Sequence, residues 1–86
     1  MAVTTLQLSP EIFGKVAHTL SEITGNELSD IGPYTDFSAD LSMSPMEMAQ
    51  LVAKIEEMYR IQIGRSDLGD METVSDLVIF IEEALS

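Results

Sequence analysis

Apolar residues recur at helical spacing in three segments of this chain, and no stretch alternates apolar and polar residues long enough to indicate a strand. The first segment begins with Ser9-Pro10-Glu11, where a capping hydroxyl precedes a proline at the first helical position and an acid in the first turn. Gly25 stands where this helix needs a left-handed C-cap. The predicted buried face between them contains Ile12, Val16, Leu20 and Ile23, with Phe13 beside it. The pattern favours an all-α fold.

A second helix is predicted to begin after Ser44, because Ser44 and Glu47 have the spacing of a capping box and Pro45 suits the first helical position. Its predicted inner stripe consists of Met46, Ala49, Val52, Ile55 and Tyr59, widened by Met48, Leu51 and Met58. The long segment at 26–43 lacks a sustained period, so it is expected to be a loop that apolar residues hold in place. The expected anchors are Leu28, Ile31, Phe37 and Leu41.

The last helix is predicted to begin at Thr73, which forms a second cap pair with Asp76. Its apolar face consists of Val74, Leu77, Val78, Ile81 and Leu85. One short helical turn is expected at 66–70, with Met71 as its anchor. The sequence therefore predicts a four-helix bundle of three main helices and one short helix, with a long first loop.

The length of 86 residues allows a single domain, predicted at 9–86, with residues 1–8 as a leader outside the fold. A hydrophobic content of 45% argues against disorder despite a formal net charge of -11. Only four lysines and arginines are present, too few to neutralise phosphates, so nucleic acid and anionic membranes are excluded as partners. A basic protein surface is the partner that this charge predicts. The expected state is a monomer in the cytoplasm.

The residues offer little support for catalysis or for a metal site. His18 has no evident nucleophile or acid partner, and the chain contains no cysteine. Asp67, Asp70 and Glu72 do not have the spacing of a calcium-binding loop. The six methionines are either core packing or the lining of an interior that opens for an alkyl chain. We therefore expect a protein that is not an enzyme and that binds no metal.

Residues 36–81 resemble the acyl carrier proteins and peptidyl carrier domains. The stretch Phe37-Ser38-Ala39-Asp40-Leu41 is similar to the F-x-x-D-L that precedes their attachment site. Residues 51–59 resemble the body and the acidic end of their second helix, and Thr73-Val74 followed by Phe80-Ile81 resembles their final helix. The resemblance implies the carrier fold and a 4′-phosphopantetheine arm. It also implies a place in fatty acid, polyketide or related biosynthesis, with synthase enzymes and a phosphopantetheinyl transferase as partners.

The chain departs from the family at the attachment site itself. Where the family has D-S-L, with the serine hydroxyl carrying the arm, this chain reads Ser44-Pro45-Met46 without a gap, and Ser42 replaces the usual glycine. Proline has no hydroxyl to modify. Two alternatives follow. Either Ser44 only caps the helix and the domain docks partners without an arm, or Ser44 is an attachment residue displaced by one position.

The resemblance assigns two further groups of residues. The docking face of the second helix comprises Met46, Glu47, Gln50, Lys54, Glu56 and Glu57. The candidates for an acyl pocket or core are Leu41, Met46, Ile55, Tyr59, Ile63, Met71 and Val74.

Overall fold

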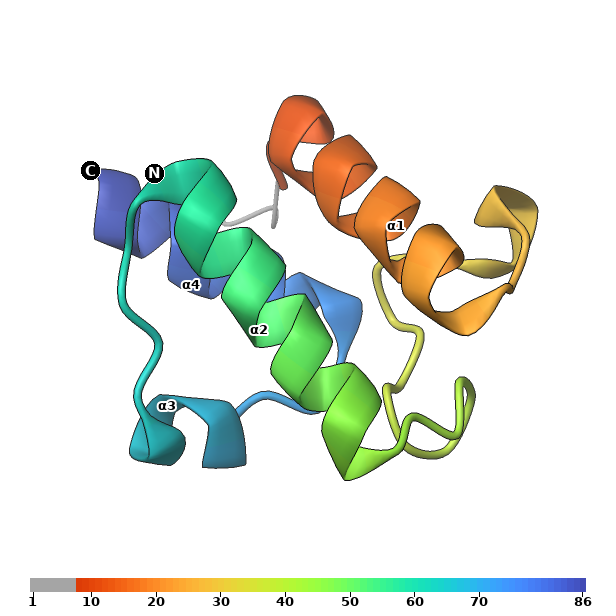
Figure 1. The fold of residues 1–86 in the computed structure, drawn as a ribbon. Helices are drawn as coiled ribbons and strands as arrows, with labels where there is room; N and C mark the ends of the chain where they lie inside the picture. Colours follow the sequence, from red (N-terminus) through yellow and green to blue (C-terminus); the bar gives the residue numbers. More distant parts are fainter. Residues whose placement is uncertain (1–7) are drawn as a thin grey trace.

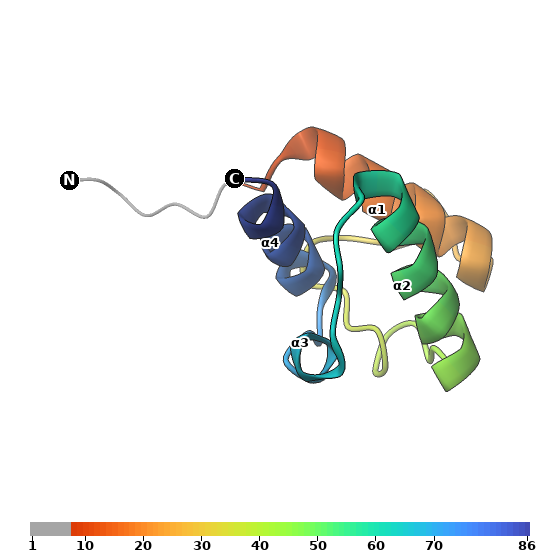
Figure 2. The same cartoon turned by 60° about the vertical axis from the view of Figure 1, so that its left-hand side comes forward.

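The computed structural model describes residues 8–86 as a helical bundle (Figure 1). Its elements are α1 (Pro10–Thr24), a 3₁₀ helix η1 (Leu28–Asp30), α2 (Pro45–Tyr59), α3 (Arg65–Gly69) and α4 (Val74–Leu85). Helix α1 packs against both α2 and α4. Residues 60–64 run back along the bundle, so that α3 lies at the end where α2 begins (Figure 2). The all-α, four-helix prediction is confirmed, and residues 1–7 of the predicted leader lie outside the described part.

The helix ends follow the capping signals in the sequence. Ser9 caps α1 by accepting the backbone N–H of Ile12, and Gly25 ends the helix in the left-handed conformation at φ 81°. Thr73 and Asp76 form a capping box at the start of α4. Because these bonds satisfy N–H groups that a helix leaves free, the predicted starts of α1 and α4 are confirmed.

The core lies where the three long helices meet. Val16, Leu20, Ile55, Val78 and Ile81 are among its most buried side chains. The prediction of burial was wrong for three residues. Leu28 is 49% exposed, Leu85 is 50% exposed and Met58 is 41% exposed. Leu85 and Met58 lie in the final turns of their helices.

The predicted phase of α2 was also wrong at its first turn. Met46 is 72% exposed and Ala49 is exposed, whereas Leu51 and Ile55 are buried. A helix turns by about 100° per residue, so the nine positions from Met46 to Ile55 place the two side chains on opposite sides. The inner face of α2 consists instead of Met48, Leu51, Val52, Ile55 and Tyr59.

Backbone hydrogen bonds tie the long loop to the start of α4. Phe37 donates its N–H to the Glu72 carbonyl at 3.0 Å. In the opposite direction, the N–H of Val74 reaches the Thr35 carbonyl at 3.0 Å, and that of Ser75 reaches the Pro33 carbonyl at 2.8 Å. Ile31, Phe37 and Leu41 are buried beneath the loop, as predicted. Hydrogen bonds and buried apolar side chains therefore hold the loop in place beside the beginning of α2.

Candidate functional site

The start of α2 is held by a reciprocal pair of hydrogen bonds. The Ser44 hydroxyl oxygen accepts the N–H of Glu47 at 3.1 Å, and the Glu47 carboxylate accepts the N–H of Ser44 at 2.9 Å. Pro45 occupies the first helical position, where its missing N–H leaves no helical hydrogen bond unmade. The predicted capping box is confirmed.

This geometry does not fit a phosphopantetheine arm at Pro45. The arm needs a side-chain hydroxyl at that position, and the proline ring provides no nucleophile. The nearest hydroxyl along the chain is that of Ser44, an exposed residue outside the helix proper. Its oxygen already accepts one hydrogen bond, and within residues 8–86 its O–H has no acceptor. Ser44 is therefore accessible, and it is the residue directly before the helix.

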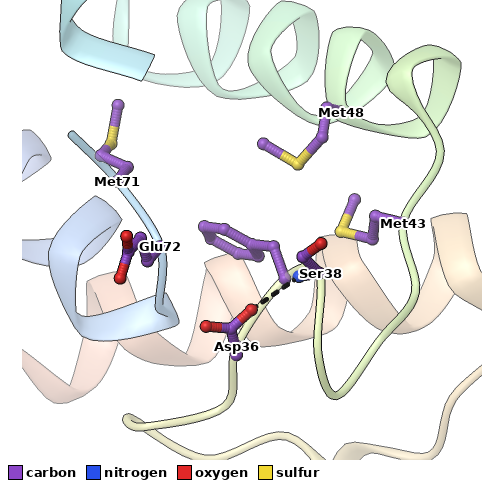
Figure 3. A pocket seen from close by; sticks show the side chains of 7 residues that line it. Asp36, Ser38, Met43, Met48, Met71 and Glu72 are labelled. Atoms are coloured by element: carbon purple, nitrogen blue, oxygen red, sulfur yellow. Dashed lines mark hydrogen bonds between the residues drawn. The ribbon is translucent and has the colours of Figure 1, made fainter. Parts of the chain in front are cut away.

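A pocket of about 390 Å³ opens beside this helix start (Figure 3). Met43 and Met48 line one side of it, and Met71 lies across from them on the segment that precedes α4. The remaining lining residues are Asp36, Phe37, Ser38 and Glu72. Asp36 is fixed in place because its carboxylate accepts the N–H groups of Ser38 and Ala39, both at 2.8 Å. The lining of the pocket therefore combines four apolar side chains with one hydroxyl and two carboxylates.

The apolar lining continues inward from this pocket. A narrow gap of about 10 Å³ shares Phe37, Met48 and Met71 with the pocket. Beyond these it is lined by Leu51, Val52, Ile55, Ile63, Leu68 and Leu77. Two of the three shared residues, Met48 and Met71, are methionines, whose unbranched side chains are flexible.

The sequence located these pocket residues only in part. Met71 lines the open pocket, and Ile55 and Ile63 line the inner gap. Leu41 and Val74 are buried and Tyr59 is half-buried, yet they line neither space, and Met46 points outward. Sequence reasoning missed Phe37, Met43 and Met48 as pocket residues. The available signal was the clustering of methionines on either side of the helix start.

The predicted docking residues fall into two groups. Met46, Gln50, Lys54 and Glu57 are exposed on the outer side of α2. Glu47 and Glu56 are half-buried, and their carboxylates accept backbone N–H groups, from Ser44 and Ile63 respectively. Of the three carboxylates in the predicted docking set, Glu57 is exposed, whereas Glu47 and Glu56 are each held by a backbone hydrogen bond.

The rest of the described chain adds no reactive centre. His18 is exposed and lies 3.8 Å from the Glu22 carboxylate. Burial of the Tyr59 hydroxyl raises its pKa, and the nearby Glu11 carboxylate raises it further. Within residues 8–86 no three potential ligand side chains come together as a metal site. No helix in the same range has both the length and the apolar character needed to cross a membrane.

Comparison with known proteins places these observations in a family context. A family model for the phosphopantetheine attachment site matches residues 14–81. The chain is 34% identical over 83 residues to the meromycolate extension acyl carrier protein of Mycobacterium leprae, covering 96% of this chain and 69% of that protein. Its Mycobacterium bovis counterpart is 33% identical over 73 residues, covering 85% of this chain and 64% of that protein. The chain thus spans about two thirds of the length of these relatives.

A solved structure is similar in fold. The solution structure of a protein from Anaplasma phagocytophilum, described as an acyl carrier protein, superposes with a TM-score of 0.86. The match covers 96% of this chain and 98% of that chain, at 20% sequence identity. At that identity the likeness concerns the fold alone.

Proposed function

Because this chain belongs to the acyl carrier protein family, whose prosthetic group is 4′-phosphopantetheine, we propose that it docks acyl-processing enzymes without carrying the arm at Pro45. Acyl carrier proteins are carriers and not enzymes, and the chemistry belongs to their partners. The proposed setting is fatty acid, polyketide or related biosynthesis in the cytoplasm, with the domain acting as a monomer. The net charge of -11 favours partners whose surfaces are basic overall.

One observation carries this proposal. When Ser44-Pro45-Met46 is set without a gap against the family's D-S-L, Pro45 takes the place of the attachment serine, and in the structure its ring is built into the first turn of α2. The Ser44 hydroxyl next to it holds the Glu47 N–H at 3.1 Å, so a substituent on that oxygen competes with the helix cap. Both features suit a stable helix start and disfavour modification.

A second candidate function is carriage on Ser44. Two observations favour it: the Ser44 side chain is exposed, and the methionine-lined pocket opens beside the same helix start. In that case Met43, Met48 and Met71 would receive the alkyl part of a cargo. The helix geometry counts against this candidate, because Ser44 has an extended backbone at φ -79° and ψ 163° and precedes the first helical turn, in which Pro45 lies.

Intact-mass analysis distinguishes the two candidates. The full chain is incubated with coenzyme A and an excess of a broad-specificity phosphopantetheinyl transferase, so that slow docking does not limit the endpoint. We expect the wild type to gain no mass. We expect the double variant S44D/P45S to gain one arm, because aspartate caps a helix about as well as serine and the new hydroxyl stands at the family position.

The Ser44→Ala variant is the control for the displaced site. An adduct on the wild type that maps to Ser44 and disappears in Ser44→Ala would overturn the proposal and establish the second candidate. An S44D/P45S variant that stays unmodified while keeping the wild-type circular dichroism would also contradict it, because residue 45 would then not be the obstacle.

A further inference from the structure

The methionine-lined pocket beside the start of α2 is polar at one edge and apolar at the other. Asp36 and Glu72 supply its two carboxylates, and the hydrogen bond from the Phe37 N–H to the Glu72 carbonyl keeps their two segments adjacent. Met43 and Met48 lie across from these carboxylates (Figure 3). The pocket volume of about 390 Å³ falls within the range of small-molecule sites, about 300–1,000 Å³. The pocket therefore has the size and the two-sided lining that suit an amphiphilic molecule.

The lining loses its polar groups from the pocket inward. The inner gap begins at Phe37, Met48 and Met71, which it shares with the pocket, and every side chain that lines the gap is apolar. Both carboxylates belong to the pocket alone. A ligand in this space therefore has its charged group at the outside and its apolar part directed towards the gap, because burying a charge among apolar side chains is costly.

The two carboxylates have no cation of their own. Within residues 8–86, no lysine or arginine lies within 4.0 Å of a carboxylate. Asp36 Oδ1 is held by the N–H groups of Ser38 and Ala39, both at 2.8 Å, whereas its Oδ2 accepts no hydrogen bond from the described residues. Glu72 is exposed, and no described group donates to its carboxylate. The pocket thus offers one oriented carboxylate and one further carboxylate to a cation from outside the chain.

An organic ammonium group suits these carboxylates better than a divalent metal does. Within residues 8–86, no third potential ligand side chain joins Asp36 and Glu72 in a metal site. The methionine thioethers beside them are soft ligands, which magnesium and calcium do not favour. An ammonium group donates three N–H bonds and needs no fixed set of ligands. An aliphatic chain attached to it would also contact the apolar wall of the pocket, which a metal ion would leave unused.

We propose that this pocket binds a free small molecule that has a primary ammonium group on an aliphatic chain. The ammonium lies between the Asp36 and Glu72 carboxylates, and the chain passes the methionines towards the inner gap. The ligand is not attached to the protein, so the inference goes beyond the proposed function and is independent of modification at Ser44. An aliphatic carboxylate is rejected, because it would face two like charges in a chain of net charge -11. A neutral aliphatic molecule gains only the apolar contacts.

Titration of the full chain with octylammonium tests the proposal. Octylammonium is kept below the concentration at which it forms micelles, and salt at about 0.15 M screens the general attraction of an organic cation to an acidic surface. Backbone amide NMR shifts give both the affinity and the location of the site. We expect one saturable site, with shifts at Phe37, Met48 and Met71. Octanoate and octanol should bind at least about tenfold more weakly, and so should methylammonium, which has the charge but no chain.

Two double variants with the same loss of charge provide the matched comparison. D36N/E72Q removes both carboxylates from the pocket, and asparagine retains a side-chain oxygen that can accept the same backbone N–H groups. Circular dichroism checks that the fold persists. We expect D36N/E72Q to bind octylammonium at least about tenfold more weakly than the wild type. E27Q/E57Q removes two exposed carboxylates outside the pocket and should bind as the wild type does.

Three results would overturn the proposal. Equal affinity for octanoate or octanol would show that the carboxylates do not select the ligand. Equal weakening in the two double variants would show that binding depends on net charge and not on the pocket. Shifts that spread over the acidic surface without saturation would show adsorption in place of a site. Ser44→Ala, which cannot be modified at residue 44, is expected to keep the wild-type affinity, and a loss of binding in this variant would contradict the independence from Ser44.

Discussion

The Glu56 carboxylate accepts the backbone N–H of Ile63 at 2.8 Å, which joins the body of α2 to the segment that leads into α3. Ile63 is buried, so its N–H has little access to water when this acceptor is removed. We expect Glu56→Ala to lower the free energy of unfolding by about 1–3 kcal/mol in urea denaturation. Glu57→Ala, the exposed neighbour, is the control and should change it by less than about 0.5 kcal/mol. Equal effects would show that the hydrogen bond contributes nothing.

The corrected phase of α2 gives a contrast between two apolar side chains. Ile55 is fully buried, and truncation to alanine is expected to cost about 2–4 kcal/mol because it removes apolar contacts and leaves a cavity. Met46→Ala, on the opposite side, should change the unfolding free energy by less than about 0.5 kcal/mol. Thermal or urea unfolding of both variants measures this. A large loss from Met46→Ala would restore the original sequence interpretation.

Ser42 adopts a left-handed backbone conformation at φ 50°, immediately before the segment that enters α2. For a residue with a Cβ atom this conformation costs about 1–2 kcal/mol, whereas glycine adopts it freely. Because glycine also has more conformational freedom to lose on folding, we expect Ser42→Gly to stabilise the protein by about 0.5–1 kcal/mol. Ser29→Gly, in η1, is the control and should not stabilise it. A lower urea midpoint for Ser42→Gly would contradict the argument.

The Tyr59 hydroxyl is covered by protein and, within residues 8–86, has no hydrogen-bond partner. Burial and the Glu11 charge raise its pKa above the ordinary value of 10.0, so above that pH the unfolded state releases this proton more readily than the folded state. Folding stability should therefore fall as the pH rises through and beyond 10. We expect Tyr59→Phe to match or exceed the wild type at neutral pH and to widen its advantage under alkaline conditions.

The matched control is Tyr34→Phe, on a side chain that is 76% exposed. Urea midpoints measured from neutral to alkaline pH should follow the wild-type profile in this variant. If Tyr59→Phe also follows that profile, the Tyr59 hydroxyl is not responsible for the alkaline loss.

The helix ends were the most predictable part of the fold. Ser9, Ser44 and Thr73 act as caps because each side chain bonds to a backbone group within three residues, so the signal is local. The exposure of Met46 and Leu28 was not predictable in the same way. Their burial depends on which side of an element faces its neighbours, and that is decided by packing between segments far apart in the sequence.

The candidate site likewise has one part that could be predicted from the sequence and one part that could not. The absence of a hydroxyl at residue 45 follows from the sequence alone. The pocket does not follow from the sequence, because its lining combines Met43 and Met48 with Met71 and Glu72 from a distant segment. The hydrogen bond between the Phe37 N–H and the Glu72 carbonyl joins the two segments. The hydrogen bond from the Ile63 N–H to the Glu56 carboxylate, seven residues away, was equally unpredictable, because the pattern of charges in the sequence does not indicate it.

The attachment of the long loop to α4 has an evolutionary consequence. The Pro33 and Thr35 carbonyls supply the acceptors for the first N–H groups of α4, and every amino acid carries a carbonyl. Substitutions in this part of the loop can therefore accumulate without loss of the acceptors, provided that the backbone path is kept and Phe37 stays buried. The hold of the loop on α4 at residues 33 and 35 thus depends on the path of the backbone and not on which side chains stand there.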